Sequence, residues 1–521
     1  MSAHSSAADR GGSPRAGRQD VPEGGHAEHR AGAHDAQEAP IADILAHYER
    51  LSARDQYIVR PSVAERLRAL GVEDADELLP DPLGGPSTTS RDDVPPLGAE
   101  ADPVGGDARG KRAWPSPPAP EAYHGLAGDI VRAIEPDTEA DSVALLAHVL
   151  AGYGSMINRQ AHYRVEDTEH RANEYYVLVG ATAKGRKGTA ERRIRRLLRS
   201  VDEAWDNERV VSGLSSGEGL LWAVRDAIYR PDRNRKTGMV EQVLVDPGIA
   251  DKRLLVIEPE IASALRAMQR QGNTLSPILR RAWDGEQVLA ALTKNSPARA
   301  TGAHISVIAH VTEGELRREL DAVEQANGYG NRHLYLCVRR ARVLPFGGGA
   351  STDLAPLVER LERAVKHGRA TGRVAMDAEA ADAWTRVYPV LSGERPGLLG
   401  ALTARAEAHV VRLALLYALL DCASEIQHEH LLAALALWAY AEASTQYVFG
   451  DATGDPIADE ILEALRRSAT GLTRTEIRDL FGRHHGSGRL GGALVALARA
   501  GLATVSTEQT GGRPAERWRA A

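Results

Sequence analysis

A strand, a glycine-bounded loop and a helix follow one another in one stretch, which constrains the fold more than any other feature of the sequence. Tyr175–Val179 has the aromatic and β-branched residues of a buried strand. Gly180 and Gly185 bound a loop that contains Lys184, and Thr189–Val201 reads as a helix with a basic face. Backbone N–H groups at the start of such a helix, with a lysine beside them, form a cradle for phosphate. We therefore expect a phosphate-binding loop.

The spacing of this loop departs from the usual pattern G-x4-G-K-[ST]. Arg186 follows the second glycine, so Lys187 comes one place late and the hydroxyl of Thr189 later still. A glycine turn without a nucleotide would fit the same letters, and the interpretation therefore depends on the segments that come after the loop. The residues expected to contact phosphate are Gly180, Lys184, Gly185, Arg186, Lys187, Gly188 and Thr189, the last also as a ligand of Mg²⁺.

Composition bounds the remaining possibilities. The chain has 521 residues, enough for about three domains. Its formal net charge of −7 gives no global basic field, so nucleic acid would have to bind a local face. Two cysteines exclude a disulfide framework and suit a reducing cytoplasm. No apolar run approaches the ~20 residues of a membrane span. We expect a cytoplasmic protein without membrane contact.

The chain divides into five predicted parts by composition and periodicity. Residues 1–38 are small and polar and are expected to be a disordered arm. Residues 39–121 hold short helical patterns and a Pro/Gly-rich linker. Strands alternate with helices over 122–345, which predicts an α/β layered, mostly parallel sheet. Residues 346–450 are expected to be helical, and 455–521 read as three short helices and a hairpin, a winged-helix pattern.

Acidic side chains follow the most strand-like run of the chain. Arg253–Glu258 ends in Glu258, and Glu260 lies two places on, about seventy residues after the glycine loop. Such a carboxylate can hold the water shell of Mg²⁺, and a second one can orient the attacking water. We assign the metal to Glu258 and the water to Glu260 or to Glu218, between which the sequence does not choose. The alternative is a strand that ends in solvated acids.

Two further polar residues are candidates for sensing the phosphate. His310 comes near the end of an apolar strand, where a γ-phosphate sensor would project, although a histidine at such a place is more often structural. Arg332 precedes the next strand, and an arginine held there can reach across a subunit boundary and stabilise transition-state charge. The alternative for Arg332 is a surface salt bridge.

Basic residues at two places suggest contacts with DNA. Lys294 and Arg299 lie on a polar loop between two inner strands, and in ring-shaped motors such loops track the nucleic-acid backbone. Arg489 and Arg513 in the C-terminal unit are candidates for phosphate contacts of a winged helix. Winged helices also dock proteins, and this alternative stays open.

From Trp114 to about Ala441 the sequence resembles a large bacterial family of P-loop ATPases, whose members are often found on mobile elements and beside or fused to primase-polymerase modules. The resemblance is carried by five segments, Tyr123–Val131, Val179–Thr189, Gly213–Leu220, Lys294–Ser306 and Gly330–Arg332. It implies a RecA/AAA-like P-loop NTPase core that uses ATP and Mg²⁺. It also implies that the late lysine is the family's own form of the loop.

The helical tract Leu402–Ala414 resembles the lid of minichromosome-maintenance-type helicases, in which an arginine at the position of Arg405 senses nucleotide. No primase-polymerase domain is visible in this chain, so a primase/polymerase is expected only as a partner.

These observations predict an ATPase core with a helical lid, a C-terminal winged helix and a disordered N-terminal arm. The expected function is that of a helicase-like replication factor of a mobile element, working as a homo-oligomeric ring. Single-stranded DNA would lie in the pore and duplex DNA at the winged helix. Two alternatives remain: an ATP-switched DNA-binding regulator or defence-type ATPase that does not translocate, and a structural relic of a phosphate loop.

Overall fold

The computed structural model describes Leu79 and residues 114–181, 185–233, 239–291, 298–320, 328–348, 353–393, 395, 397–450, 453, 455–509 and 514–521. The predicted disordered arm and most of the predicted linker therefore lie outside the described residues. Three of the predicted site residues, Lys184, Lys294 and Arg513, also lie outside them.

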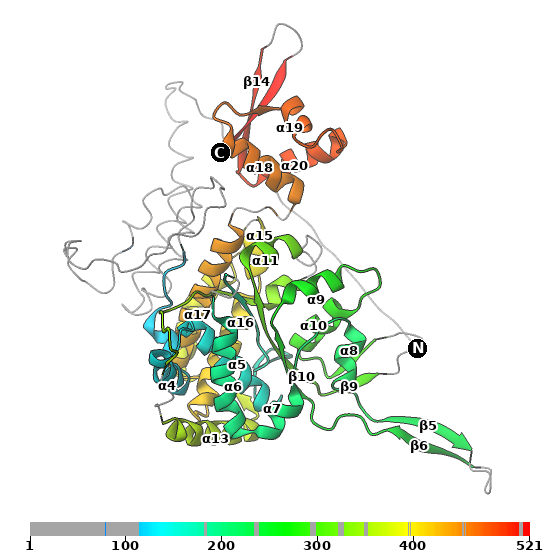
Figure 1. The fold of residues 1–521 in the computed structure, drawn as a ribbon, viewed down its shortest axis with the longest axis vertical. Coiled ribbons are helices and arrows are strands. Elements are labelled where there is room, and N and C mark those ends of the chain that lie inside the picture. Colours follow the sequence, from blue (N-terminus) through cyan, green and yellow to red (C-terminus); the bar gives the residue numbers. More distant parts are fainter. Residues whose placement is uncertain are drawn as a thin grey trace, which may run out of the picture.

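A five-stranded parallel sheet forms the centre of the fold (Figure 1), which confirms the predicted α/β class. Its spatial order is β11-β3-β10-β7-β4, and every neighbouring pair is parallel. The strands are β3 (Tyr175–Val179), β4 (Val210–Val211), β7 (Arg253–Glu258), β10 (His304–Val311) and β11 (Leu334–Cys337). The strand that leads into the predicted phosphate loop, β3, lies between β10 and β11.

Helices cover both faces of this sheet because the strands are apolar on both sides. Side chains alternate along a strand, so Tyr176 and Leu178 pack on one face while Tyr175 and Val177 pack on the other. On the first face lie α5 (Ser142–Met156), α6 (Lys187–Val201), α16 (Ala406–Leu420) and α17 (His428–Phe449). On the second lie α8 (Gly217–Trp222), α9 (Ile261–Met268), α10 (Leu275–Trp283) and α11 (Glu313–Glu319).

The region 346–450, which was predicted to be helical, is helical with one exception. Its other helices are α13 (Ala355–Ala370), α14 (Ala378–Leu391) and α15 (Gly397–Thr403). The exception is β12 (Arg373–Val374), which joins β1 (His162–Val165) and β2 (Thr168–Arg171) in a small sheet. Sequence reasoning missed β12 because its partner strand, β1, lies some two hundred residues earlier. The remaining short helices of the core are η1 (Pro120–Tyr123), α4 (Gly125–Ile134), η2 (Glu135–Asp137), α7 (Glu203–Arg209) and η3 (Gly330–Arg332).

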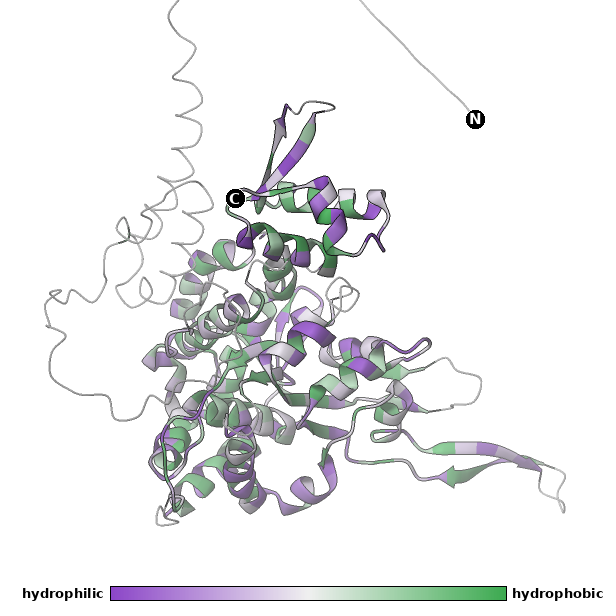
Figure 2. Cartoon of the chain, turned by 45° about the horizontal axis from the view of Figure 1, so that its top comes forward, coloured by the Kyte–Doolittle hydropathy of each residue, from purple (hydrophilic) through white to green (hydrophobic). Residues whose placement is uncertain are grey.

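Two antiparallel hairpins interrupt the alternation of strands and helices. β5 (Ile228–Arg233) and β6 (Val240–Asp246) form a ribbon that projects from the body (Figure 1). Apolar side chains on it, such as Tyr229 and Leu244, are about half exposed, and Figure 2 shows apolar and polar stretches along its length. β8 (Val288–Ala290) and β9 (Arg299–Thr301) form the second hairpin, on the chain between α10 and β10.

The C-terminal unit has its own hydrophobic core, built around Trp518. Its helices are α18 (Pro456–Arg467), α19 (Arg474–Leu480) and α20 (Ser487–Arg499). A three-stranded antiparallel sheet of order β13-β15-β14 completes it, from β13 (Leu472–Thr473), β14 (Ala503–Glu508) and β15 (Ala515–Ala520). The Thr473 hydroxyl and the Glu476 carboxylate form a capping box at the start of α19. Across the described residues of the whole chain, no helix is long and apolar enough to cross a membrane.

Candidate active site

A crevice is expected between the carboxyl ends of β3 and β10, because the chain leaves these neighbouring strands on opposite sides of the sheet. After β3 it enters α6, whose Ile194 and Leu197 pack on the α5 face. After β10 it enters α11, whose Leu316 packs on the other face. In open α/β sheets, ligands bind at such a reversal of direction. The predicted phosphate loop leaves β3 at this point.

The side chain of Lys187 reaches from the first turn of α6 to the carboxyl ends of β3 and β10. Its Nζ donates to the carbonyl oxygens of Gly180 at 2.5 Å, Val311 at 3.1 Å and Ala181 at 3.3 Å. It therefore bridges the ends of β3 and β10. Burial lowers the pKa of Lys187 to about 8, and the nearby carboxylate of Glu315 opposes that shift. A partly buried ammonium held by neutral carbonyl oxygens is a favourable site for an anion.

Arg186, the residue that makes the lysine late, turns away from the crevice. It adopts a left-handed conformation with φ of 49°, and its Nε lies 2.7 Å from the Glu139 carboxylate. Glu139 also accepts hydrogen bonds from Arg340 and from the backbone N–H of Leu344. The loop thus absorbs one extra residue and still brings Lys187 to the head of α6. Sequence reasoning missed Glu139, because it lies in no motif and is brought to the loop only by the fold.

The first glycine of the loop is required by a close backbone approach. A Cβ atom at Gly180 would lie 2.2 Å from the carbonyl oxygen of Val338, at the end of β11. Gly188 and Thr189 lie in the first turn of α6, and the N–H of Thr189 donates to the Arg186 carbonyl at 2.9 Å. Their predicted contacts with phosphate and Mg²⁺ stay predictions.

Glu258 is buried at the end of β7 and is already engaged by the backbone. Its Oε1 accepts hydrogen bonds from the N–H groups of Gly213 at 2.6 Å and Leu214 at 2.7 Å. One carboxylate oxygen thereby fixes the loop after β4, which leads to Glu218 at the start of α8. Glu260 is exposed immediately before α9. Glu218 and Glu260 remain predictions for the water-orienting base, and Glu258 for the metal.

His310 is buried near the end of β10. It precedes the last residue of β10, and its side chain is 3% exposed on the face covered by α5. Its ring packs against that of His148, with centroids 5.6 Å apart and planes at 83°. Burial, with the nearby charge of Lys187, lowers the pKa of His310 to about 4, so its ring is neutral at pH 7. The predicted γ-phosphate sensor is thus a buried neighbour of Lys187, and its sensing role stays a prediction.

Arg332 and Arg405 lie together at the other end of the sheet. Arg332 donates to both carboxylate oxygens of Asp284, at 3.1 and 2.7 Å, and Arg405 Nε donates to Asn331 Oδ1 at 3.1 Å. Both guanidinium groups lie over the ring of Trp283, at 5.6 and 5.4 Å from its centroid.

This position separates the two arginines from the phosphate loop of the same chain. η3, which carries Arg332, precedes β11, whereas the loop follows β3, and the two strands are parallel neighbours. Four residues of strand, at ~3.3 Å each, separate the two ends by ~13 Å. The two arginines and Lys187 therefore lie at opposite edges of the sheet.

The predicted DNA contacts are placed as follows. Arg299 is exposed at the start of β9, paired with Ala290 of β8. Arg489 forms two 2.7 Å hydrogen bonds to Asp455, the N-cap residue of α18. Its guanidinium is thus held within the C-terminal unit, and a phosphate contact would require this pair to open.

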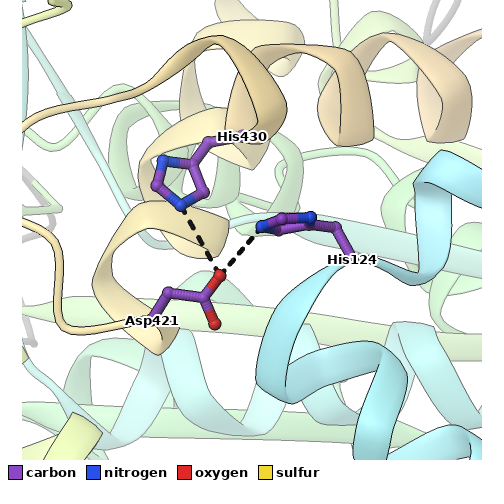
Figure 3. A group of neighbouring side chains, drawn as sticks. All are labelled: His124, Asp421 and His430. Atoms are coloured by element: carbon purple, nitrogen blue, oxygen red, sulfur yellow. Dashed lines mark ion pairs between the residues drawn. The ribbon is translucent and has the colours of Figure 1, made fainter.

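Three side chains with metal-ligating atoms meet away from the sheet edge (Figure 3). Asp421 Oδ2 lies 3.0 Å from His124 Nε2 and 3.5 Å from His430 Nε2. The backbone N–H of Gln427 donates to His430 Nδ1 at 3.0 Å, so the proton of a neutral ring lies on Nε2. A metal ion would need the lone pair of that nitrogen. The group is therefore better suited to clasp α4, α16 and α17 together than to bind a metal.

We expect Asp421→Asn to lower the free energy of unfolding at pH 7 by about 1–3 kcal/mol, because Asp421 also accepts from Leu126 N–H at 2.9 Å. Hydrogen bonds from His124 and His430 and from this N–H hold the pKa of Asp421 below its usual range, against the effect of burial. The stabilisation is complete above the unfolded pKa of about 4 and disappears as pH falls through the lower folded pKa.

Urea unfolding of the two proteins from pH 3 to pH 8 measures this effect. The difference in the free energy of unfolding between the wild type and Asp421→Asn should become smaller in acid. A gap that stays constant down to pH 3, or that zinc ions enlarge, would contradict the hydrogen-bonded clasp.

No protein-family model matches the chain, and no curated protein matches it.

Proposed function

We propose that this chain is a Mg²⁺-dependent ATPase with a RecA/AAA-like P-loop core. One observation carries the proposal: Lys187 Nζ is held between the carboxyl ends of β3 and β10, at the head of α6. A lysine there can neutralise the β- and γ-phosphates of ATP while the N–H groups of the helix bind their oxygens. Arriving phosphates would replace the carbonyl oxygens of Gly180 and Val311 as partners of the ammonium.

The remaining parts have defined tasks in this proposal. Thr189 and Glu258 hold Mg²⁺, and Glu260 or Glu218 orients the attacking water. His310 supports the loop from below as a neutral ring. Helices α13 to α17 form the lid, and the C-terminal unit is a winged helix that contacts duplex DNA. Single-stranded DNA would pass the hairpin that bears Arg299.

The arrangement of the arginines supports an oligomer. Arg332 and Arg405 cannot reach a nucleotide bound at their own loop, because the length of β3 lies between them. Arg332 is 6% exposed and donates to Asp284 and to the Gly328 carbonyl, so it would have to leave these partners to meet the γ-phosphate of a neighbouring copy, where arginine stabilises the charge of the transition state. The proposed working form is therefore a homo-oligomeric ring or partial ring in which each chain completes its neighbour's site, as a helicase-like replication factor of a mobile element would.

The dependence of ATP hydrolysis on DNA tests this function. Steady-state turnover is measured with no DNA, with a single-stranded oligonucleotide and with the matching duplex, beside Glu260→Ala. A motor is expected to hydrolyse ATP at least about tenfold faster with the single strand, because translocation couples the two sites. Slow turnover with tight duplex binding would favour an ATP-switched regulator. Absence of turnover in all three conditions would contradict the ATPase assignment.

A further inference from the structure

We infer that His409 is the positioning residue for both arginines that act on the neighbouring copy. The inference rests on the proposed function and adds to it the element that aligns the two arginines. Arg332 and Arg405 come from different parts of the chain, the turn η3 and the start of α16. Both guanidinium groups lie near Asp284 and over Trp283, and His409 occupies the point where the two segments meet.

The imidazole of His409 makes two polar contacts. Its Nδ1 lies 2.6 Å from a carboxylate oxygen of Glu174, and its Nε2 lies 3.0 Å from the backbone carbonyl oxygen of Asn331. Nε2 donates to the Asn331 carbonyl, and Nδ1 shares a proton with the Glu174 carboxyl group. His409 and Glu174 are 1% and 0% exposed. A buried hydrogen bond of this kind holds its partners in one geometry.

Asn331 is the residue on which His409 acts. It accepts from His409 through its backbone carbonyl and from Arg405 Nε through its side chain. It also directly precedes Arg332 in the short turn η3. Asn331 is thus linked to both arginines, and His409 fixes its backbone. Glu174, immediately before β3, anchors His409 to the strand that leads into the phosphate loop.

Aromatic packing keeps the imidazole in place. The ring stacks on Trp438, with centroids 5.7 Å apart and planes at 16°. The centroid of the Trp283 ring lies 5.3 Å from that of His409. Trp283 in turn lies beneath the guanidinium groups of Arg332, Arg405 and Arg412. This packing restricts rotation of the His409 side chain. It also holds the ring of Trp283 against the guanidinium groups that lie over it.

The test measures ATP hydrolysis by His409→Gln, whose single amide nitrogen cannot occupy the positions of both ring nitrogens. A misplacement of about 1 Å costs about a hundredfold in rate, so kcat is expected to fall by about that factor. The KM for ATP should change little, because the loop that binds ATP is intact. Glu174→Gln keeps an acceptor for Nδ1 and should retain more activity. The matched control is His304→Gln, since His304 is equally buried and bonds the Gly154 carbonyl at 2.8 Å.

Mixed oligomers separate positioning from a loss of folding. His409→Gln subunits keep an intact loop, and Lys187→Ala subunits keep intact arginines. Assembly of both variants together should restore turnover to several-fold above that of either variant alone. At some interfaces the intact loop of a His409→Gln subunit then meets the intact arginines of a Lys187→Ala subunit. A misfolded subunit would give no such rescue.

Each outcome has a defined meaning. If His409→Gln keeps wild-type kcat while Lys187→Ala and Arg332→Ala lose it, the positioning role is wrong and the ATPase stands. If Lys187→Ala keeps full turnover, the assignment of this loop as the ATP site fails, and the His409 inference fails with it. If His409→Gln does not fold, Asn331→Ala decides, because it removes the acceptor of Arg405 and leaves the buried ring in place. Wild-type kcat in Asn331→Ala would then overturn the inference.

Discussion

Lys187→Ala is expected to lower kcat for ATP hydrolysis by about a hundredfold to a thousandfold. The ammonium lies at the crevice between β3 and β10, and alanine offers no cation to replace it when charge develops on the transferred phosphate. Loss of one preorganised electrostatic contact of this type costs about 3–4 kcal/mol in the transition state. Steady-state turnover at saturating ATP and Mg²⁺ measures the effect.

Lys252→Ala is the matched control for this substitution. Lys252 Nζ also contacts backbone carbonyl oxygens, those of Val224 at 2.8 Å and Arg225 at 2.7 Å, and pairs with Asp226. It precedes β7 and so lies at the edge of the sheet away from the loop. Turnover should therefore survive in Lys252→Ala. Equal losses in both variants would mean that hydrolysis depends on general stability and not on a phosphate contact.

Arg332→Ala is expected to lower kcat by about a thousandfold or more, the range found for arginines that act across a subunit boundary. ATP binding to the variant should stay close to normal, because its own loop is untouched. Mixing Arg332→Ala with Lys187→Ala subunits should restore turnover, since the first supplies an intact loop and the second an intact Arg332. The measurement is kcat against the ratio of the two variants.

Arg225→Ala controls for the loss of a buried guanidinium. Arg225 pairs with both oxygens of Asp246, at 2.8 and 3.0 Å, and lies 4.0 Å above the ring of Trp222. These contacts resemble those of Arg332 with Asp284 and Trp283, but they lie beside Lys252, which precedes β7, and not beside β11. A rate loss in Arg332→Ala that mixing does not repair would argue for a structural ion pair and against action on a neighbour.

The central sheet and its glycine loop were predictable because their signals are local. Tyr175–Val179 and Arg253–Glu258 are apolar runs of strand length, and the sheet contains both as β3 and β7. Lys187 could be singled out because a lysine beside a loop glycine has few roles. The fold then supplies what spacing cannot: Arg186 turns outward to Glu139, and so the late lysine still reaches the crevice.

The arginine cluster was only partly predictable because its members are distant in sequence. Arg332 and Arg405 were singled out, but Glu174, Asp284 and His409 were not. Nothing near these residues in the sequence distinguishes them from an ordinary acid or a core histidine. Their significance arises only when β3, α10, η3 and α16 meet around Trp283.

The expectation for the His310 side chain depended on the exact residue at which β10 ends. The expectation of a sensor required its side chain to emerge at the carboxyl edge of the sheet. β10 continues to Val311, and alternation along the strand turns the His310 side chain toward α5. The register of β10 against β3, which pairs His310 with Leu178, is a tertiary property that the sequence pattern does not determine.

Binding of ATP to the purified chain, measured by isothermal titration calorimetry with Mg²⁺, tests the nucleotide site most directly. We expect about one ATP per chain for the wild type and for Arg332→Ala. Lys187→Ala should bind ATP at least about tenfold more weakly, a loss of about 1.4 kcal/mol or more. Wild-type protein that binds no ATP, or Lys187→Ala protein that binds it as tightly as the wild type, would contradict the assignment of this loop as a nucleotide site.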